Sequence, residues 1–350
     1  MSYAGVAPCG ARAWLGTSAM VVAGRTPGRD GIRAHRGEGG RAPVRSALLG
    51  VLVVVLLAGC TGGGDPPDQP PAKAGPKVTV GAGLSAEQQI IARMYAQALR
   101  KAGFEVTTKL NAGARTAYVP ALQRGELDVV PDYLAPVTDY LRAGVPVADR
   151  PPAATGDVEH TARLLDDLLT DRPLGVTRPS LATDQTALAV SKTLADDENL
   201  VDVSDLRRLN GTLVLGAPDG CGTDPFCLVG LRDRYGLRFK RVDELGEVSG
   251  QPIFDALRKG SADVGSVQSS DGEIAAESLV VLRDDALLEP AGNIIALYRS
   301  RLPASARAVV DSVNRALTTE KLQELNKRQD LDGQDPDGLA KRFLQDARLI

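Results

Sequence analysis

Ala121-Leu-Gln-Arg-Gly-Glu-Leu-Asp-Val129 reappears later in the chain as Ala256-Leu-Arg-Lys-Gly-Ser-Ala-Asp-Val264, so both stretches follow the pattern Ala-Leu-x-x-Gly-x-x-Asp-Val. In each stretch the pattern predicts a helix that ends at the glycine and a strand that begins two residues later. The repeat can be a coincidence, because two unrelated helix-to-strand turns can use the same common residues. We favour the alternative that the chain contains two lobes of similar α/β design.

The residues around the first copy of this pattern predict alternating strands and helices. Ser85 is expected to cap a helix, with Gln88 completing a capping box, and Gly103 suits the position just after the helix end. The predicted elements are a strand at 77–81, a helix from Ser85 to about residue 101, a strand at 104–110, a helix at about 115–124 and a strand at 127–130. This order implies a parallel sheet with helices on its faces.

Two further strands are expected to connect the lobes. Residues 184–190 form a predicted strand that leaves the first lobe, and residues 294–298 form its expected return partner. Two crossing strands make a hinge, so closure of the lobes around a ligand is the expected motion. Three helices at about 303–317, 318–328 and 335–346 are expected to return to the first lobe. The predicted boundaries are 77–187 plus 291–350 for the first lobe and 188–290 for the second lobe.

The composition is that of a soluble globular protein. Hydrophobic residues make up 43% and charged residues 24% of the 350 residues, and both fractions are ordinary. The formal net charge is −3, which gives no overall attraction to nucleic acid. We therefore expect no nucleic-acid partner.

Residues 47–58 form an apolar run that is expected to direct export. This run of about twelve residues is shorter than the roughly twenty that a membrane-spanning helix needs, and Arg41 and Arg45 precede it as in a signal peptide. It ends in Leu57-Ala-Gly-Cys60, which resembles the bacterial lipobox. Cleavage before Cys60 and attachment of a diacylglycerol to its thiol would anchor the protein on the extracytoplasmic face of the cell membrane. The alternative is a buried core segment that ends in a free cysteine.

The segments around this signal are not expected to fold. We assign the signal peptide to residues 44–59, and residues 60–76 are rich in Gly and Pro and should form a flexible tether. Residues 1–43 are interpreted as an extension that results from a misplaced start. The true start is then Met20, or Val44 read from a GTG codon, and Cys9 would not be translated.

The residues available for catalysis do not favour an enzyme. The exported part contains one histidine, His160, so neither a Ser-His-Asp triad nor a His-rich metal cluster can be built. No nucleotide-binding Gly-rich motif is present, because Gly62–Gly64 follows no strand. A hydrolase with a carboxylate pair from Asp132, Asp184 or Asp271 is the remaining enzyme alternative. Acidic residues at strand ends more often bind ligands, so we expect no catalysis, no cofactor and no metal.

Polar residues lie at the ends of two predicted strands. Pro131-Asp132-Tyr133 follows a strand of the first lobe, and Gln268-Ser269-Ser270-Asp271 follows a strand of the second lobe. Ligands of open α/β sheets bind at the carboxyl ends of strands. The two stretches can therefore face each other across a cleft.

Cys221 and Cys227 form a second pair of cysteines, separate from those near the N-terminus. An exported protein meets oxidising conditions, so we expect a disulfide between them that closes a short loop. The alternative, a redox or zinc site, is disfavoured because the spacing is wrong and partner ligands are missing.

Several stretches resemble the glycine betaine, choline and osmoprotectant-binding proteins of ABC importers. Residues 110–133 are similar to the most recognisable block of that family, and Val80-Gly81 with Glu87-Gln88 resembles its opening strand and helix. Further similar blocks are 235–239, 269–276, 279–285, Leu325-Asn326 and Asp335-Pro336. The resemblance covers about residues 77–350 in order. It implies a type II periplasmic-binding-protein fold, with two α/β lobes, each a helix-covered, mostly parallel sheet, and a cleft between them.

The resemblance also implies a ligand of the betaine or choline class, but the residues at the matching positions differ. Betaine binders of the family hold the quaternary ammonium in a box of aromatic rings, and here Tyr133 stands at one box position. Thr186, Gln268 and Asn293 fill the other positions, and Gly83 stands where the family can use a lysine. We therefore predict weak binding of glycine betaine and a preference for a solute with more hydrogen-bonding groups.

The candidate ligand-binding residues combine these positions with the strand ends. They are Tyr133, Asp132, Arg115, Asp184, Thr186, Gln268, Ser269, Asp271 and Asn293. Arg115, at the start of a helix, can contact an anionic group or be an ordinary surface charge. Whether Tyr118 or Tyr140 supplies another ring stays open.

Solute capture for import is the leading function. The resemblance implies a monomer that binds a small polar solute and passes it to an ABC permease, and through it to an ATPase. The alternative is a ligand-sensing or cell-envelope lipoprotein that has the same fold and no transport role.

Overall fold

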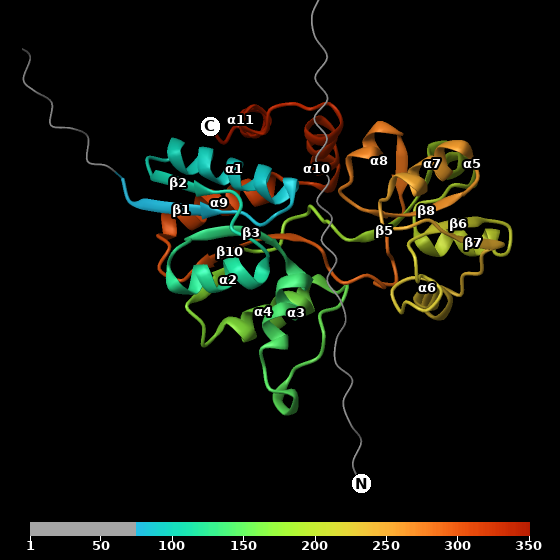
Figure 1. Cartoon of the computed structure of the whole chain (residues 1–350), viewed down its shortest axis with the longest axis horizontal. Helices are drawn as coiled ribbons and strands as arrows, with labels where there is room; N and C mark the ends of the chain where they lie inside the picture. Colours follow the sequence, from blue (N-terminus) through green and yellow to red (C-terminus); the bar gives the residue numbers. More distant parts are fainter. Residues whose placement is uncertain (1–74) are drawn as a thin grey trace, which may run out of the picture. The chain divides into compact units, whose positions relative to one another are not determined.

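Residues 75–350 are described by a computed structural model, and they contain two sheets with helices (Figure 1). The first sheet contains β1 (Lys77–Gly81), β2 (Glu105–Lys109), β3 (Val129–Tyr133), β4 (Leu174–Val176) and β10 (Ile294–Arg299). The second sheet contains β5 (Thr186–Ser191), β6 (Val214–Ala217), β7 (Arg241–Glu244), β8 (Val264–Gln268) and β9 (Leu279–Val281). We call each sheet with its helices the first and the second lobe. The predicted N-terminal extension, the signal peptide, the lipidated Cys60 and most of the tether lie outside the described residues.

The two sheets repeat one topology. The strand order is β2-β1-β3-β10-β4 in the first sheet and β7-β6-β8-β5-β9 in the second. β1 pairs in parallel with β2 and β3, as β6 does with β7 and β8. β10 and β5 run antiparallel to both of their neighbours. The prediction of two α/β lobes with mostly parallel sheets is confirmed, and each sheet is mixed because its fourth strand enters from the other lobe in the opposite direction.

The repeated sequence pattern forms the same joint in both lobes. Gly125 and Gly260 have φ angles of 77° and 68° and end their helices in the left-handed conformation. The Asp128 carboxylate then accepts a hydrogen bond from the Thr79 backbone N–H at 2.6 Å. In the second lobe the Asp263 carboxylate accepts one from the Val214 N–H at 2.7 Å. The pattern is therefore structural, because each aspartate joins the strand after it to the neighbouring parallel strand, β1 in the first sheet and β6 in the second.

Helices cover both faces of each sheet, as Figure 1 shows. In the first lobe, α1 (Ala86–Lys101), α9 (Ala304–Ala316) and α11 (Pro336–Asp346) pack on one face around a core that includes Ile90 and Val310. The other face carries α2 (Arg115–Arg124), α3 (Leu134–Ala143) and α4 (Val158–Leu169). The helices of the second lobe are α5 (Lys192–Glu198), α6 (Leu228–Tyr235), α7 (Gln251–Lys259) and α8 (Gly272–Ala276). The remaining elements are α10 (Thr319–Asn326), 3-10 turns at Val147–Asp149 and Val203–Leu209, and a π turn at Lys327–Leu331.

The helix ends follow the capping residues. The Ser85 hydroxyl accepts a hydrogen bond from the Gln88 N–H at 3.1 Å, and Gly103 after α1 has a φ angle of 92°. The Ser85 cap and the Gly103 position are confirmed, but Gln88 does not complete a capping box, because its side-chain amide donates to the Pro131 carbonyl at 3.0 Å instead. The third strand was predicted at 127–130, but β3 begins at Val129. The difference arises because the side chain of Asp128 takes the hydrogen bond of Thr79 that a strand backbone would otherwise accept.

The chain crosses between the lobes at two adjacent segments. The Ile294 N–H donates to the Ala182 carbonyl and the Asp184 N–H donates to the Gly292 carbonyl, each at 2.9 Å. The chain thus leaves the first lobe at 184–190 and returns to it at 294–298, as predicted. β5 and β10 lie in different sheets, and strands of their own sheets occupy both of their edges.

α10 adds a third link between the lobes. α9 and α11 pack with α1 as expected, but α10 also contacts α8 of the second lobe. The Gln323 side chain donates to the Ser269 carbonyl at 2.7 Å, and the Asn326 side chain donates to the Ser270 carbonyl at 2.8 Å. The C-terminal helices thus hold the end of β8 from the side of the first lobe.

The predicted disulfide between Cys221 and Cys227 is present. Both sulfurs lie in the core of the second lobe, beside Leu231 of α6. Phe226, in the loop between them, is 47% exposed.

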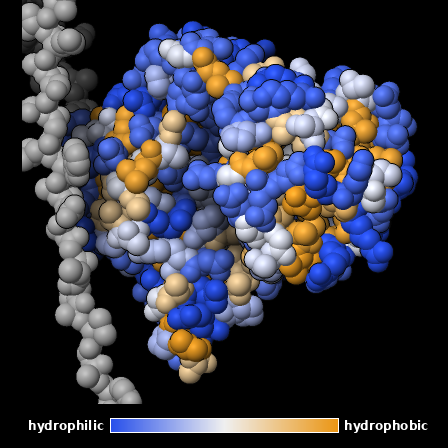
Figure 2. All heavy atoms as spheres, turned by 45° about the vertical axis from the view of Figure 1, so that its right-hand side comes forward, coloured by the Kyte–Doolittle hydropathy of each residue, from blue (hydrophilic) through white to orange (hydrophobic). Residues whose placement is uncertain are grey.

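The surface carries hydrophobic side chains in small groups. Figure 2 shows them separated by hydrophilic residues on the face in view. Exposed large hydrophobic residues include Leu84, Val147, Leu181 and Phe226, which belong to different segments. Such scattered residues are normal for a protein surface. No helix within 75–350 combines the length and hydrophobicity that crossing a membrane requires.

Candidate functional site

A cavity of about 220 Å³ lies where β3 and β8 end, and we call it the interlobe pocket. Ligands of open α/β sheets bind at such carboxyl ends. The start of α1, the end of β3 and the C-terminal end of α10 form one part of its wall, and the end of β8 with the start of α8 forms another. The lining residues are Ser85, Ala86, Glu87, Tyr133, Asp184, Gln268, Ser270, Asp271, Gly272, Asn326 and Asp330.

Glu87 connects several of these elements. It is placed by the Ser85 cap in the first turn of α1 and is only 7% exposed. Its carboxylate accepts a hydrogen bond from the Tyr133 hydroxyl at 2.8 Å and one from the Asn326 amide, also at 2.8 Å. The same amide nitrogen donates to the Ser270 carbonyl. Glu87 therefore joins α1, β3 and α10, and Asn326 extends the link to the second lobe.

Three carboxyl groups of the pocket have raised pKa values. Burial raises the pKa of Glu87 to about 7, and the neighbouring Asp184 carboxylate adds to the rise. Burial is also the main cause of the raised pKa of Asp184 and of Asp271. Burial and the charge of Glu87 raise the pKa of Tyr133, so this phenol stays protonated and donates its hydrogen bond.

The charges in the pocket have one sign. Glu87, Asp184, Asp271 and Asp330 line it, and among its lining residues, all of them in the described part of the chain, there is no lysine, arginine or histidine. Desolvated carboxylates are stabilised by cations or by hydrogen-bond donors. The arrangement is therefore suited to a ligand that brings positive charge or donors.

Four of the residues predicted from the sequence line the interlobe pocket: Tyr133, Asp184, Gln268 and Asp271. Ser269, which follows Gln268 in the sequence, is buried and does not line the pocket. Its hydroxyl donates to the Thr183 carbonyl at 2.9 Å and accepts from the Gln185 N–H at 3.2 Å. Ser269 thus holds the crossing segment rather than lining the pocket.

Arg115 and Asp132 form a separate ion pair. The Arg115 guanidinium contacts the buried Asp132 carboxylate at 2.7 Å, and the Tyr118 hydroxyl donates to the same carboxylate at 2.7 Å. Arg115 was offered as a contact for an anionic ligand, but its charge is balanced by Asp132. Tyr118 is buried at this pair, and Tyr140 of α3 packs against the core of the first lobe, so neither ring lines the pocket.

Thr186 and Asn293 lie near the hinge but not in the interlobe pocket. The Asn293 amide donates to the Ser180 carbonyl at 2.9 Å, and this side chain borders a different cavity beside α4. Thr186 borders a third cavity inside the second lobe. Thr186 of β5 lies opposite Gln268 of β8 in the sheet, yet only Gln268 lines the interlobe pocket. Two residues that are paired across neighbouring strands therefore do not both belong to the site.

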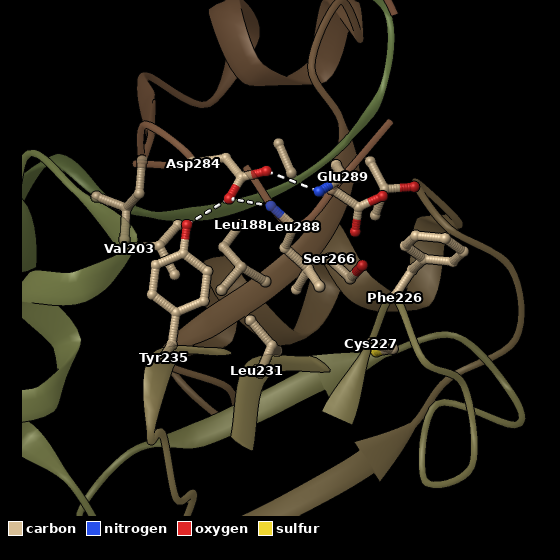
Figure 3. Close-up of a pocket in the computed structure, with 13 residues that line it drawn as sticks. Leu188, Val203, Phe226, Cys227, Leu231, Tyr235, Ser266, Asp284, Leu288 and Glu289 are labelled. Carbon is tan, nitrogen blue, oxygen red and sulfur yellow. Dashed lines mark hydrogen bonds between the residues drawn. The ribbon is translucent and has the colours of Figure 1, made fainter. Parts of the chain in front are cut away.

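The third cavity lies under the disulfide loop and is shown in Figure 3. Its volume is about 30 Å³, which is room for about two water molecules. The Asp284 carboxylate in its wall accepts hydrogen bonds from the Leu288 and Glu289 N–H groups at 2.9 and 2.7 Å. Burial raises the pKa of Glu289 to about 8, with Asp284 adding to the rise. The cavity is too small for an organic solute.

Sequence reasoning missed Glu87, Asn326 and Asp330 as lining residues, whereas Ser270 belongs to the polar stretch that was expected to face the cleft. Glu87 could have been found, because it follows the helix cap directly beyond the end of β1. Asn326 could not, since 239 residues separate it from the carboxylate that it contacts.

The profile of one protein family matches residues 76–346, and it describes the substrate-binding domain of the ABC-type glycine betaine transport system. A glycine-betaine-binding protein of Pseudomonas aeruginosa is 27% identical over 294 residues, covering 77% of this chain and 88% of that protein. The carnitine transport binding protein OpuCC of Listeria monocytogenes is 27% identical over 167 residues, covering 45% of this chain and 51% of that protein.

Solved structures share the fold. The crystal structure of a glycine betaine/carnitine/choline ABC transporter protein gives a TM-score of 0.69 at 24% identity and covers 79% of this chain and 99% of that chain. Apo YehZ from Escherichia coli gives a TM-score of 0.70 at 19% identity and covers 78% of this chain and 99% of that chain. The related proteins are substrate-binding transport proteins and not enzymes. The family match spans both sheets, so the chain belongs to the family of substrate-binding domains of ABC-type glycine betaine transport systems.

Proposed function

We propose that this protein is an extracytoplasmic lipoprotein that captures a small polar solute in the interlobe pocket and delivers it to the permease of an ABC importer. The observation that carries the proposal is the pocket itself. It lies at the carboxyl ends of β3 and β8, and residues of both lobes line it. The lobes are connected by crossing segments at 182–184 and 292–294, and closure about such a hinge is how this kind of site encloses a ligand.

The relatives named for glycine betaine and carnitine suggest an osmolyte-like solute. A cage of aromatic rings, however, has a single candidate among the lining residues, Tyr133. A cation–π contact is worth roughly 0.5–2 kcal/mol. Weak betaine binding therefore remains our expectation.

The proposal is tested by identifying the bound solute. The protein is isolated without denaturant from the bacterium that produces it, then denatured, and the released small molecules are analysed by mass spectrometry. Uptake of the identified solute is then measured in cells that lack the gene. We expect uptake to fall and to return with the intact gene, but not with the Asp184→Asn variant. Unchanged uptake in cells that lack the gene would contradict the import function and favour the sensing alternative.

The membrane anchor is part of the same proposal. The lipobox ending at Cys60 supports it, because a diacylglycerol with an N-acyl chain buries enough methylene groups for stable attachment. Anchoring would keep the pocket near the permease after each release of solute.

A further inference from the structure

We propose that the interlobe pocket selects a cation that carries N–H donors and no carboxylate, such as a primary or secondary ammonium, over a quaternary ammonium or a zwitterion. This inference rests on the proposed function, since it names the chemical class that the same pocket takes. Three observations carry it: the charge of the lining residues, the buried oxygen atoms that lack donors, and the fixed orientation of Asn326.

The charge disfavours a ligand that carries a carboxylate. Four acidic side chains line the pocket, and no lining residue is cationic. Arg115, the one cation among the candidate residues predicted from the sequence, is ion-paired with buried Asp132. A betaine or an amino acid would therefore bring its carboxylate towards like charges without a counter-charge, whereas a simple cation would not.

The unused hydrogen-bonding atoms are acceptors. Oδ1 of Asp184 and Oδ1 of Asn326 are inaccessible to solvent, and neither has a hydrogen-bond partner within residues 75–350. Asn326 is only 6% exposed, so its amide oxygen is held in a buried position at the pocket. Buried polar atoms are nearly always paired. A ligand that donates hydrogen bonds would pair these two oxygens, and a trimethylammonium group has no hydrogen to donate.

The orientation of the Asn326 amide is fixed by its neighbours. Its nitrogen donates to the Glu87 carboxylate and to the Ser270 carbonyl, each at 2.8 Å. Rotating the amide by half a turn would place its oxygen against these two acceptors, so the oxygen must be the free end. Gln268 also lines the pocket with an unpaired Oε1. No side-chain hydrogen bond within 75–350 fixes that amide, so it can present either its oxygen or its nitrogen to a ligand.

The test uses ligands that differ only in the number of N–H groups. The purified protein is titrated by calorimetry with ethanolamine, N-methylethanolamine, N,N-dimethylethanolamine and choline. This series keeps the carbon chain and the hydroxyl group while it removes the N–H donors one at a time. We expect affinity to fall along the series, by about tenfold or more between ethanolamine and choline. Glycine and glycine betaine, which add a carboxylate, should bind more weakly than ethanolamine.

Variants show whether binding occurs in this pocket. Asp184→Asn removes one charge without changing size and should weaken ethanolamine binding by about tenfold or more. Asp149→Asn, an exposed residue outside the pocket, makes the same change of charge and should leave binding unchanged. Thermal unfolding of both variants verifies that they are folded.

The possible outcomes separate this inference from the proposed function. Tighter binding of choline than of ethanolamine, or of betaine than of either, would overturn the inference and leave solute capture intact. Equal loss of binding in Asp184→Asn and Asp149→Asn would also overturn it, because the effect would then come from net charge alone. A lack of binding by every member of the series would overturn it as well. The proposed function is tested separately, by measuring uptake of the solute in cells that lack the gene.

Discussion

At the scale of single residues, Glu87 combines a structural and an electrostatic role. Its carboxylate is held by the Tyr133 hydroxyl and the Asn326 amide, and Asp184 and Ser270 lie beside it. Burial raises its pKa from 4.5 to about 7. The folded protein therefore binds a proton more tightly at this position than the unfolded chain does.

This shift predicts a loss of stability as the pH rises. The raised pKa stabilises the folded state below about pH 4.5, and that contribution is lost as the pH rises through about 7. A shift of this size corresponds to about 3 kcal/mol in the free energy of unfolding. Glu87→Gln removes the titrating group, so the variant should lose less stability than the wild type between about pH 5 and pH 8. Urea unfolding at both pH values measures the difference.

The matched control is Glu159→Gln on α4, whose carboxylate is 86% exposed. This variant should keep the pH dependence of the wild type. If Glu87→Gln also kept the pH dependence of the wild type, the loss of stability with rising pH would not come from titration of Glu87. Asp184 has a raised pKa from the same cause, so part of the slope should persist in the Glu87 variant.

Some residue-scale features could be predicted and others could not. Ser85 and Gly103 act within a few residues of their own position, so local capping rules were sufficient. Asn326 acts on Glu87 across 239 residues, and nothing local to either residue indicates that contact. Arg115 was predicted as a candidate for ligand contact, but its partner Asp132 could be recognised only once the strand end and the helix start were placed side by side.

At the scale of elements, the repeated helix-to-strand turn shows why this part of the fold could be predicted from the sequence. The glycine ends the helix, and the aspartate carboxylate accepts a hydrogen bond from the neighbouring parallel strand of the sheet. One short pattern thus specifies both a helix end and a strand neighbour. β5 and β10 carry no comparable signal, because their antiparallel pairing with β8 and β3 depends on where the chain crosses between the lobes.

The disulfide loop before α6 gives a prediction about an element. The bond closes a loop between residues six positions apart, and closing such a loop is expected to stabilise by roughly 2 kcal/mol. The Cys221→Ala/Cys227→Ala double variant should lose about that amount in urea unfolding. Alanine avoids placing a hydroxyl in the core that both cysteines occupy.

Reduction of the wild-type protein provides the control for this prediction. Intact-mass analysis should show a gain of about two daltons, one hydrogen atom for each sulfur, and the reduced protein should unfold at the lower denaturant concentration. Equal stability of the oxidised and reduced forms would show that the loop is already ordered by its packing alone.

At the scale of the whole molecule, attachment to the membrane depends on a single residue outside the folded lobes. Cys60→Ala removes the thiol that would carry the lipid. We expect the variant to be found in the soluble fraction, while the wild type stays with the membranes after a carbonate wash. Cys60→Ser offers a second variant with the same expectation. Persistence of either variant in the washed membranes would contradict the lipobox interpretation.

Movement of the lobes is the largest change that the fold permits. The lobes are joined by backbone hydrogen bonds at the crossing segments and by the contacts of Gln323 and Asn326 with the end of β8. The Thr183 N–H donates to the Thr319 hydroxyl at 3.0 Å, so the crossing segment and α10 are themselves joined and can act as one pivot. Leu84 and Glu247 are both exposed and follow strands β1 and β7, so labels placed there report on the two lobes.

Closure is therefore measured as a change of distance between the lobes. In the Cys60→Ala protein, Leu84→Cys and Glu247→Cys carry a fluorescent donor and acceptor, and energy transfer is recorded during a titration with ethanolamine. We expect transfer to increase with saturation, because a ligand that contacts both lobes stabilises the state in which they are close. The pair Leu84→Cys and Lys101→Cys, at the two ends of α1, should show no change, since both labels move with the first lobe. If transfer between the lobes stayed constant while calorimetry showed saturation, the solute would be held by a pocket that is already formed, and hinge closure would not be part of its capture.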